Sequence, residues 1–139
     1  MKKILVVDDS TCTRKIISLM LKANGYITYQ AEDGLDALEK LSNLKADLVI
    51  IERDMPNMDG LTFTRSVRNN FYLLDIPVVM VTESFDEGLK KDAQRAGIDC
   101  ILAKPISSAS LVSHVESLLK ERIDGRSADR QRRTAGNYK

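Results

Sequence analysis

Acidic side chains close two apolar runs of this 139-residue chain. Asp8 and Asp9 follow the run Ile4–Val7, Glu52 ends another run, and Asp54 comes two residues later. Carboxylates that meet in one crevice repel one another and raise each other's pKa unless a cation shares the site. Mg²⁺ takes oxygen ligands of this kind. An adjacent pair of acids alone is a weak signal, but acids at the ends of different strands predict a magnesium site.

Two further polar residues follow later apolar runs. Thr82 comes at the end of the fourth run, and Lys104 follows the fifth. A lysine ammonium can pair with a phosphoryl oxygen, and a threonine hydroxyl can reorient to hydrogen-bond it. Taken singly, Thr82 would be a solvated strand end and Lys104 a surface charge. Beside the acids they favour phosphoryl chemistry.

Short apolar runs alternate with segments of helical period up to about residue 122, which is typical of βα units around a parallel sheet. The predicted strands are Lys3–Asp8, Ile27–Ala31, Asp47–Glu52, Ile76–Val81 and Cys100–Ala103. The predicted helices are about Thr11–Asn24, Leu35–Leu44, Gly60–Asn69, Asp86–Ala96 and Ser108–Arg122, the first with Ile16, Ile17, Met20 and Leu21 at helical spacing. The second strand alternates in polarity and so predicts an edge. Ligands of such sheets bind outside the carboxyl ends of the strands, where the site residues lie.

The chain resembles the receiver domain of two-component response regulators (CheY-like) over about residues 3 to 122. The resemblance rests on Asp8-Asp9, Glu52 with the M-P-N-M-D-G stretch 55–60, Thr82 and Lys104-Pro105, whose peptide bond is usually cis in that family. It implies one α/β domain with a flavodoxin-like (βα)5 doubly wound parallel sheet and the strand order 2-1-3-4-5.

The resemblance also implies a role for each site residue. An Asp at the position of Glu52 accepts a phosphoryl group in the family, and the residues at the positions of Thr82 and Lys104 contact that group. The implied ligands of Mg²⁺ are Asp9 directly, Asp8 through water, Glu52, and Asp54 through its backbone carbonyl.

Glu52 departs from the family pattern by one methylene group. Its carboxylate advances by about one C–C bond, ~1.5 Å, compared with Asp. Phosphoryl transfer depends on positioning, and a misplacement of ~1 Å can cost ~10²-fold in rate. We therefore expect transfer to Glu52 to be blocked. Its single negative charge imitates only in part the charge of about −1.5 to −2 on a phosphate. Asp54 is not expected to replace it, because the family uses the backbone there.

A second departure lies at Ile101, three residues before Lys104. Receivers of this type commonly have an aromatic residue at that position, and its rotation accompanies movement of the threonine. Without a ring, the switch coupled to Thr82 is expected to be rewired or absent.

We predict a signalling module, not an enzyme, that acts by protein contact in a two-component phosphorelay. The expected partners are a sensor histidine kinase or phosphotransfer protein, and a downstream effector that binds the face formed by residues 86–96, 100–103 and 108–122. A phosphorylation-independent pseudo-receiver that serves as an interaction module stays open as an alternative.

Two other classes fit the sequence less well. A flavodoxin-like electron carrier would use the hydroxyl-rich loop 10–13 to hold a flavin phosphate, but Asp8 and Asp9 would repel that phosphate and the chain has no Trp to cover the ring. A phosphohydrolase with an Asp nucleophile generally ends a strand with D-x-D. The sequence Asp8-Asp9-Ser10 does not match, and Glu52-Arg53-Asp54 has the wrong first residue.

Composition limits the remaining possibilities. With 43% hydrophobic and 29% charged residues the chain is typical of a soluble globular protein, and its net charge of +1 argues against binding nucleic acid through bulk electrostatics. No apolar stretch resembles a signal peptide or approaches the ~20 residues that span a bilayer, so we expect a cytoplasmic protein without membrane contact. Cys12 and Cys100 are expected as free thiols. Residues 1–122 form the predicted receiver domain, and 123–139 form a basic tail expected to be disordered.

Overall fold

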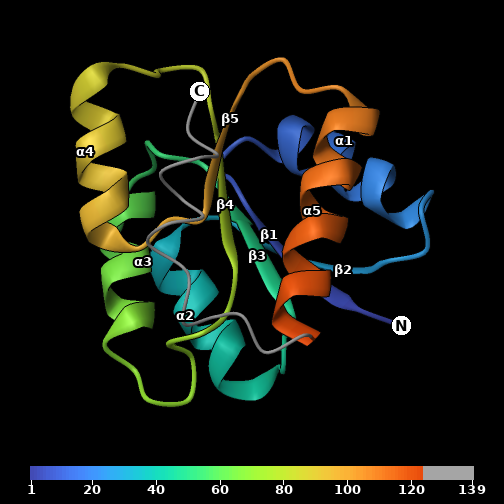
Figure 1. The fold of residues 1–139 in the computed structure, drawn as a ribbon, viewed down its shortest axis with the longest axis horizontal. Coiled ribbons are helices and arrows are strands. Elements are labelled where there is room, and N and C mark those ends of the chain that lie inside the picture. Colours follow the sequence, from blue (N-terminus) through green and yellow to red (C-terminus); the bar gives the residue numbers. More distant parts are fainter. Residues whose placement is uncertain (124–139) are drawn as a thin grey trace.

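Five parallel strands lie side by side in the computed structural model, which describes residues 1 to 123 (Figure 1). Within these residues the strands are β1 (Lys3–Val7), β2 (Ile27–Ala31), β3 (Leu48–Ile51), β4 (Val78–Thr82) and β5 (Cys100–Ala103). The helices are α1 (Thr11–Lys22), α2 (Gly34–Asn43), α3 (Gly60–Arg68), α4 (Glu87–Ala96) and α5 (Ser108–Ile123). The strand order is β2-β1-β3-β4-β5. The predicted flavodoxin-like fold of five βα units is confirmed.

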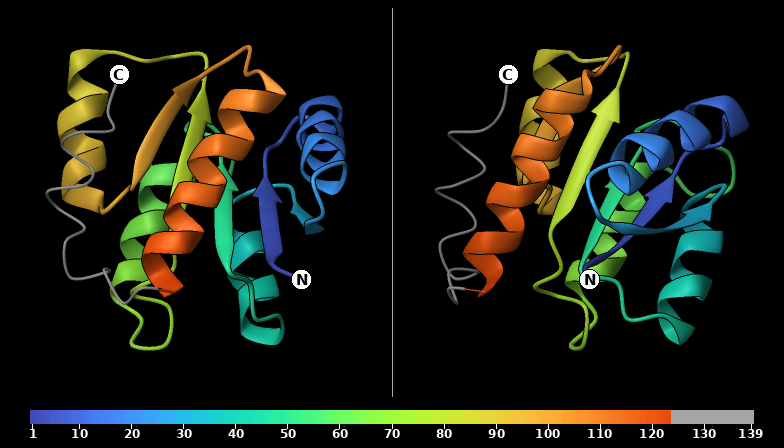
Figure 2. Two further views of the ribbon diagram at one scale, coloured as in Figure 1. Left: turned by 45° about the vertical axis from the view of Figure 1, so that its right-hand side comes forward. Right: turned by 90° about the vertical axis from the view of Figure 1, so that its right-hand side faces the viewer.

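Helices cover both faces of the sheet. Figures 1 and 2 show α1 and α5 on one face, and α2, α3 and α4 on the other. Because side chains alternate along a strand, Leu5 and Val7 of β1 pack on the α2–α3–α4 side, whereas Ile4 and Val6 pack on the α1–α5 side. Burial on both faces explains the nearly unbroken apolar runs. The edge strand β2 is only partly buried, as its alternating sequence predicts.

An acceptor side chain precedes each of the five described helices. Ser10, Asp33, Asp59, Asp86 and Ser107 each accept a hydrogen bond from the backbone N–H three residues on, and this fixes the first turns of α1 to α5. At the far end of α4, Gly97 has a φ of 96°, a left-handed conformation that favours glycine. These helix ends fix where the loops of the carboxyl edge begin.

The predicted element boundaries differ from the structure by at most two residues. β1 ends at Val7 rather than Asp8, and β3 ends at Ile51 rather than Glu52, because the pairing between the two strands stops at Val7 and Ile51. Both acids therefore begin loops. In α1, Ile16 shares the helical spacing of the buried face but is 47% exposed, because it lies at the border of that face.

The other expectations about the chain concern its cysteines, its membrane contact and its tail. Cys12 is exposed and Cys100 is buried, and neither forms a disulfide within the part of the chain that the structure describes, as predicted. Among residues 1 to 123, no helix combines the length and the apolar character needed to traverse a bilayer. Apart from Ile123, which ends α5, the segment 123–139 that was expected to be a disordered tail lies outside the described residues.

Candidate functional site

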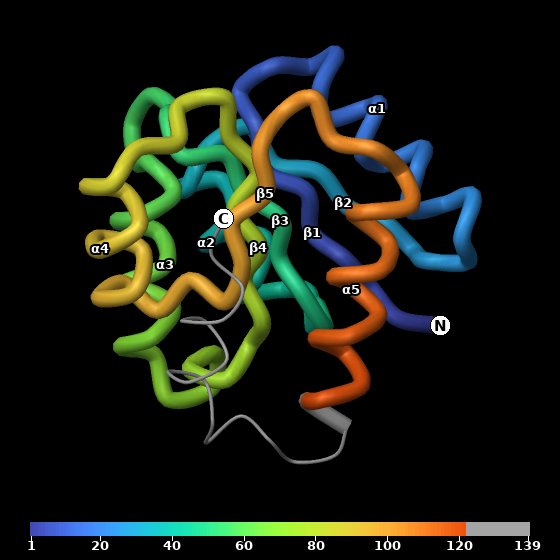
Figure 3. The backbone as a smooth tube through the Cα atoms, turned by 45° about the horizontal axis from the view of Figure 1, so that its top comes forward, coloured from blue at the N-terminus to red at the C-terminus, as the bar shows by residue number. Residues whose placement is uncertain are grey.

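The residues singled out in the sequence meet at the carboxyl edge of the sheet. The loops that follow β1, β4 and β5 lie at this edge (Figure 3). Neighbouring backbones hold the edge together, since Glu52 N–H donates to the Val7 carbonyl at 3.0 Å and Lys104 N–H donates to the Thr82 carbonyl at 2.9 Å. The next bond, Lys104–Pro105, is cis, as the resemblance implied. The strand ends therefore bring Asp8, Glu52, Thr82 and Lys104 into one region.

Lys104 joins the two buried acids. Its Nζ donates to Asp8 Oδ2 at 2.9 Å and to Glu52 Oε1 at 2.5 Å. The side chains of Lys104, Asp8 and Glu52 are 13%, 4% and 9% exposed, so all three charges are largely withdrawn from water. An ammonium thus stands at the point on which both carboxylates converge.

The remaining carboxylate oxygens have donors as well. Asp8 Oδ1 accepts the N–H of Ser10 at 2.8 Å. Glu52 Oε2 accepts the N–H of Arg53 at 2.6 Å and that of Asp54 at 3.4 Å. Each oxygen of the two buried acids therefore accepts at least one hydrogen bond from the protein itself.

The charge of Lys104 is stabilised by its partners. Burial lowers the pKa of the ammonium, but the hydrogen bonds and negative charges of Glu52 and Asp8 outweigh burial and raise that pKa above its usual value. Lys104 is therefore protonated at neutral pH, and its Nζ lies within ion-pair distance of both acids.

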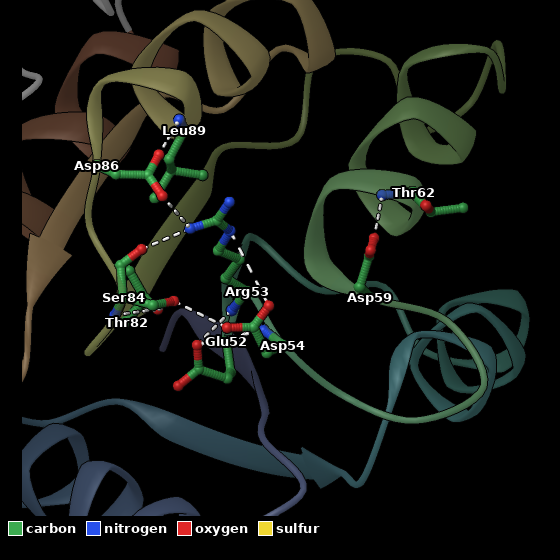
Figure 4. Close-up of polar contacts among 9 residues, drawn as sticks. All are labelled: Glu52, Arg53, Asp54, Asp59, Thr62, Thr82, Ser84, Asp86 and Leu89. Carbon is green, nitrogen blue, oxygen red and sulfur yellow. Dashed lines mark hydrogen bonds and ion pairs between the residues drawn. The ribbon is translucent and has the colours of Figure 1, made fainter.

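Thr82 makes its contacts away from Glu52. The resemblance implies that both Lys104 and Thr82 contact a phosphoryl group carried at position 52. Thr82 Oγ1, however, lies 3.2 Å from Ser84 Oγ and accepts the Ser84 N–H at 3.2 Å. Ser84 Oγ in turn donates to Asp54 Oδ2 at 2.8 Å (Figure 4). Lys104 thus contacts Glu52 directly, whereas the hydroxyl of Thr82 contacts Ser84, which in turn contacts Asp54.

The expected magnesium ligands are only partly assembled. Asp8 and Glu52 converge on one cation, which suits the chemistry of a divalent metal, but that cation is the ammonium of Lys104. Asp9 is exposed to solvent. Among residues 1 to 123, no three Asp, Glu, His or Cys side chains form a group that could hold a metal ion. The acids fit Mg²⁺ in type, and two of their four carboxylate oxygens already accept hydrogen bonds from Lys104.

Three residues that sequence reasoning did not single out also belong to this region. Arg14 Nη1 donates to the Asp8 carbonyl at 2.6 Å. Arg53 Nη1 donates to the Ser84 carbonyl at 2.5 Å and to Asp86 Oδ2 at 3.3 Å. Asp86 could have been found as a helix N-cap, because it directly precedes a helical segment. Neither arginine stands in a pattern that indicates its partner.

Two pockets lie close to the site. One, of about 500 Å³, opens beside α1 and is lined by Thr13, Ile16, Ile17, Met20, Glu83, Lys104, Pro105 and Ile106. The other, of about 400 Å³, lies along β5 and α5 and is lined by Ile101, Leu102, Ala103, Pro105, Ile106, Ser107, Ser110 and His114. Ile101 itself is 1% exposed and packs in the α2–α3–α4 core. Position 101, where receivers of this type commonly have an aromatic residue, is thus filled by a buried aliphatic side chain.

Comparisons with known proteins agree on one family. The family model "Response regulator receiver domain" matches residues 4–116. The chain is 34% identical to the chemotaxis protein CheY of Pseudomonas aeruginosa, and the match covers 88% of this chain and 99% of that protein. The structure of the chemotaxis protein CheY4 of Vibrio cholerae has a TM-score of 0.81 and 30% identity over 85% of this chain and 98% of that one. The receiver domain of a signal transduction histidine kinase from Syntrophus aciditrophicus has a TM-score of 0.81 and 32% identity over 86% and 91%. The region matched by the family model contains every site residue described above.

Proposed function

The chain belongs to the response regulator receiver domain family of two-component signalling, and we propose that Glu52 blocks phosphoryl transfer in it and partly imitates the phosphorylated state. The protein acts by contact with other proteins and not as an enzyme. Its output is set by binding rather than by turnover.

The observation that carries this proposal is the 2.5 Å contact between Glu52 Oε1 and Lys104 Nζ. In a phosphorylated receiver an ammonium at this position would meet a phosphoryl oxygen, and here it already has an anionic partner. Oε2 of Glu52 accepts two backbone N–H groups, and the whole residue is 8% exposed. Both oxygens of the would-be nucleophile are therefore engaged and shielded from an incoming phosphodonor.

Mg²⁺ belongs to the proposal as an ion that competes with Lys104. Asp8, Asp9, Glu52 and the backbone carbonyl of Asp54 would hold it, and when bound it would screen the negative charge of these acids. In its absence, the ammonium of Lys104 contacts both Asp8 and Glu52 and balances one of their two negative charges.

Two pockets on the surface of the protein are proposed as docking sites for its partners. The pocket beside α1 joins Lys104 to the exposed Ile16, and this supports docking of a sensor histidine kinase or phosphotransfer protein close to the site. The pocket along β5 and α5, which includes Ile101 and His114, supports contact with a downstream effector on the α4–β5–α5 face. Because the expected phosphodonor proteins act in the cytoplasm, a cytoplasmic location belongs to the same proposal.

The test compares the chain with Glu52→Asp after incubation with Mg²⁺ and a small phosphodonor. Intact-mass measurement should show no change in the unmodified chain and the gain of one phosphoryl group in Glu52→Asp, because the shorter side chain restores the position of the acceptor. Glu52→Asp combined with Asp54→Asn should gain the same group, which excludes transfer to Asp54. Stoichiometric phosphorylation of the unmodified chain would contradict the proposal.

The second candidate is an interaction module that ignores phosphorylation altogether. It is favoured by the replacement of the aromatic ring by Ile101, which leaves Thr82 without its usual partner in a switch. Effector binding distinguishes the two candidates. If Glu52 imitates phosphorylation, Glu52→Gln should bind the effector more weakly than the unmodified chain does. If the protein ignores phosphorylation, the unmodified chain and Glu52→Gln should bind the effector equally well.

A further inference from the structure

Arg53 joins the Glu52 site to the loop that precedes helix α4 (Figure 4). Its backbone N–H donates to Glu52 Oε2 at 2.6 Å. Its guanidinium donates through Nη1 to the Ser84 carbonyl at 2.5 Å and to Asp86 Oδ2 at 3.3 Å. One residue therefore contacts both the acid at the phosphoacceptor position and the segment that leads into α4.

The two carboxylate oxygens of Asp86 have different partners, Arg53 and the first turn of α4. While Oδ2 faces Arg53, Oδ1 accepts the N–H of Leu89 at 2.6 Å and thereby caps α4. Leu89 is fully buried in the α2–α3–α4 core. A movement of the Asp86 carboxylate would therefore change the first turn of α4, where that helix is anchored to the core.

The backbone of Arg53 is held on both sides. Its carbonyl accepts the N–H of Gly60, the first residue of α3, at 2.9 Å, and its own N–H is bound to Glu52. A Cβ at Gly60 would collide with the carbonyl oxygen of Glu52, so the end of β3 and the start of α3 are in close contact. A change in the Glu52 contact is therefore expected to reposition Arg53 rather than to be absorbed by a loose loop.

We propose that Arg53 is a positioning residue that transmits the state of Glu52 to the first turn of α4 through Asp86. The inference rests on the proposed function only in treating α4 as part of the output surface. With an aliphatic residue at position 101, the route through a rotating ring is absent from this chain. The contacts of Arg53 form a continuous connection in its place, with Glu52 at one end and the N-cap of α4 at the other.

The experiment measures backbone amide chemical shifts of the full chain by NMR. Glu52→Gln keeps the size of the side chain but removes the charge that faces the Arg53 N–H, and it should shift the amides of Glu87, Gly88, Leu89 and Lys90. In Arg53→Met the same Glu52→Gln change should shift these amides at least about twofold less, which is the non-additivity expected of coupled residues. Arg65→Met, which removes an exposed arginine of α3, is the matched control and should leave the response unchanged.

A second variant protects the test against simple loss of structure. Asp86→Ser keeps an N-cap acceptor for α4 but offers no carboxylate oxygen to Arg53, so it should reduce the response as Arg53→Met does. If Arg53→Met does not fold, the size of the α4 amide response in Asp86→Ser tests the inference by itself. An α4 response of equal size in the unmodified, Arg53→Met and Asp86→Ser backgrounds would overturn the inference. Because the assay uses no phosphodonor, its outcome is independent of whether Glu52 can be phosphorylated.

Discussion

Lys104 Nζ lies 2.5 Å from Glu52 Oε1, although β5, which precedes Lys104, and β3, which precedes Glu52, are separated in the sheet by β4. The long lysine side chain crosses the end of the intervening strand and also reaches Asp8 after β1, at 2.9 Å. A single cation thus connects the ends of three strands, and its removal affects both charge and structure at this edge.

Lys104→Met is expected to lower the free energy of unfolding by ~3–5 kcal/mol, because it leaves two buried carboxylates without their cation. Urea unfolding at neutral pH measures the change. Lys120→Met, which removes an exposed lysine of α5, is the control and should stay within about 0.5 kcal/mol of the unmodified chain. A loss no larger than that of the control would show that the ion pairs contribute no net stability.

Mg²⁺ is expected to bind more tightly to Lys104→Met than to the unmodified chain. Under the proposed competition, the ion displaces the ammonium from Asp8 and Glu52 in the unmodified chain, whereas in the variant these two acids have no lysine partner. We expect a gain in affinity of about tenfold or more, equivalent to ~1.4 kcal/mol. Calorimetric titration measures the affinity, and the double variant Glu52→Gln with Lys104→Met should lose the gain. Equal affinities for the unmodified chain and Lys104→Met would contradict competition by Lys104.

The gathering of Asp8, Glu52, Thr82 and Lys104 could be predicted from the sequence. Apolar runs locate the strands, parallel strands end at one edge, and the residue after each run must lie there. The partners within that edge could not be predicted. A flexible lysine stem can reach several acceptors, and its choice depends on donors such as the Ser10 N–H that already occupy the other oxygens.

Contacts between loops were the least predictable part. Arg53 and Asp86 are 33 residues apart, and both lie in loops whose relative position no hydrophobic period determines. Helical spacing likewise groups Ile16 with Ile17, but it does not show that Ile16 lies at the border of the buried face beside a pocket. Periodicity therefore predicts the strands and helices, while the connection from Glu52 to α4 depends on loop contacts that no period determines.

Asp33→Asn should destabilise the chain at neutral pH and lose its effect in acid. The N–H of Asp36, and then the side chain of Asn57, hold the pKa of Asp33 below its usual value. A depressed carboxyl pKa contributes stability that is present above the unfolded value of about 3.9 and is lost as pH falls through the folded value. Because Asn also caps helices, the expected difference at neutral pH is the charge contribution of ~0.3–1 kcal/mol at the start of α2. Urea unfolding of both forms between about pH 7 and about pH 2 should show the gap closing, and a gap that is independent of pH would contradict this assignment.

Gly60→Ala is expected to destabilise the carboxyl edge, although alanine is the better helix former. The added Cβ would collide with the carbonyl oxygen of Glu52, which is backbone and cannot swing aside, so the loop between β3 and α3 must shift at a cost of ~1–3 kcal/mol. Since the Gly60 N–H donates to the Arg53 carbonyl, the amide signals of Arg53 and Asp54 should move as well. Urea unfolding and NMR measure the two effects. Thr62→Ala, at an exposed position of the same helix, is the control and should change neither the stability nor these amide signals. An unchanged stability of Gly60→Ala would mean that β3 and α3 are not in tight contact at this point.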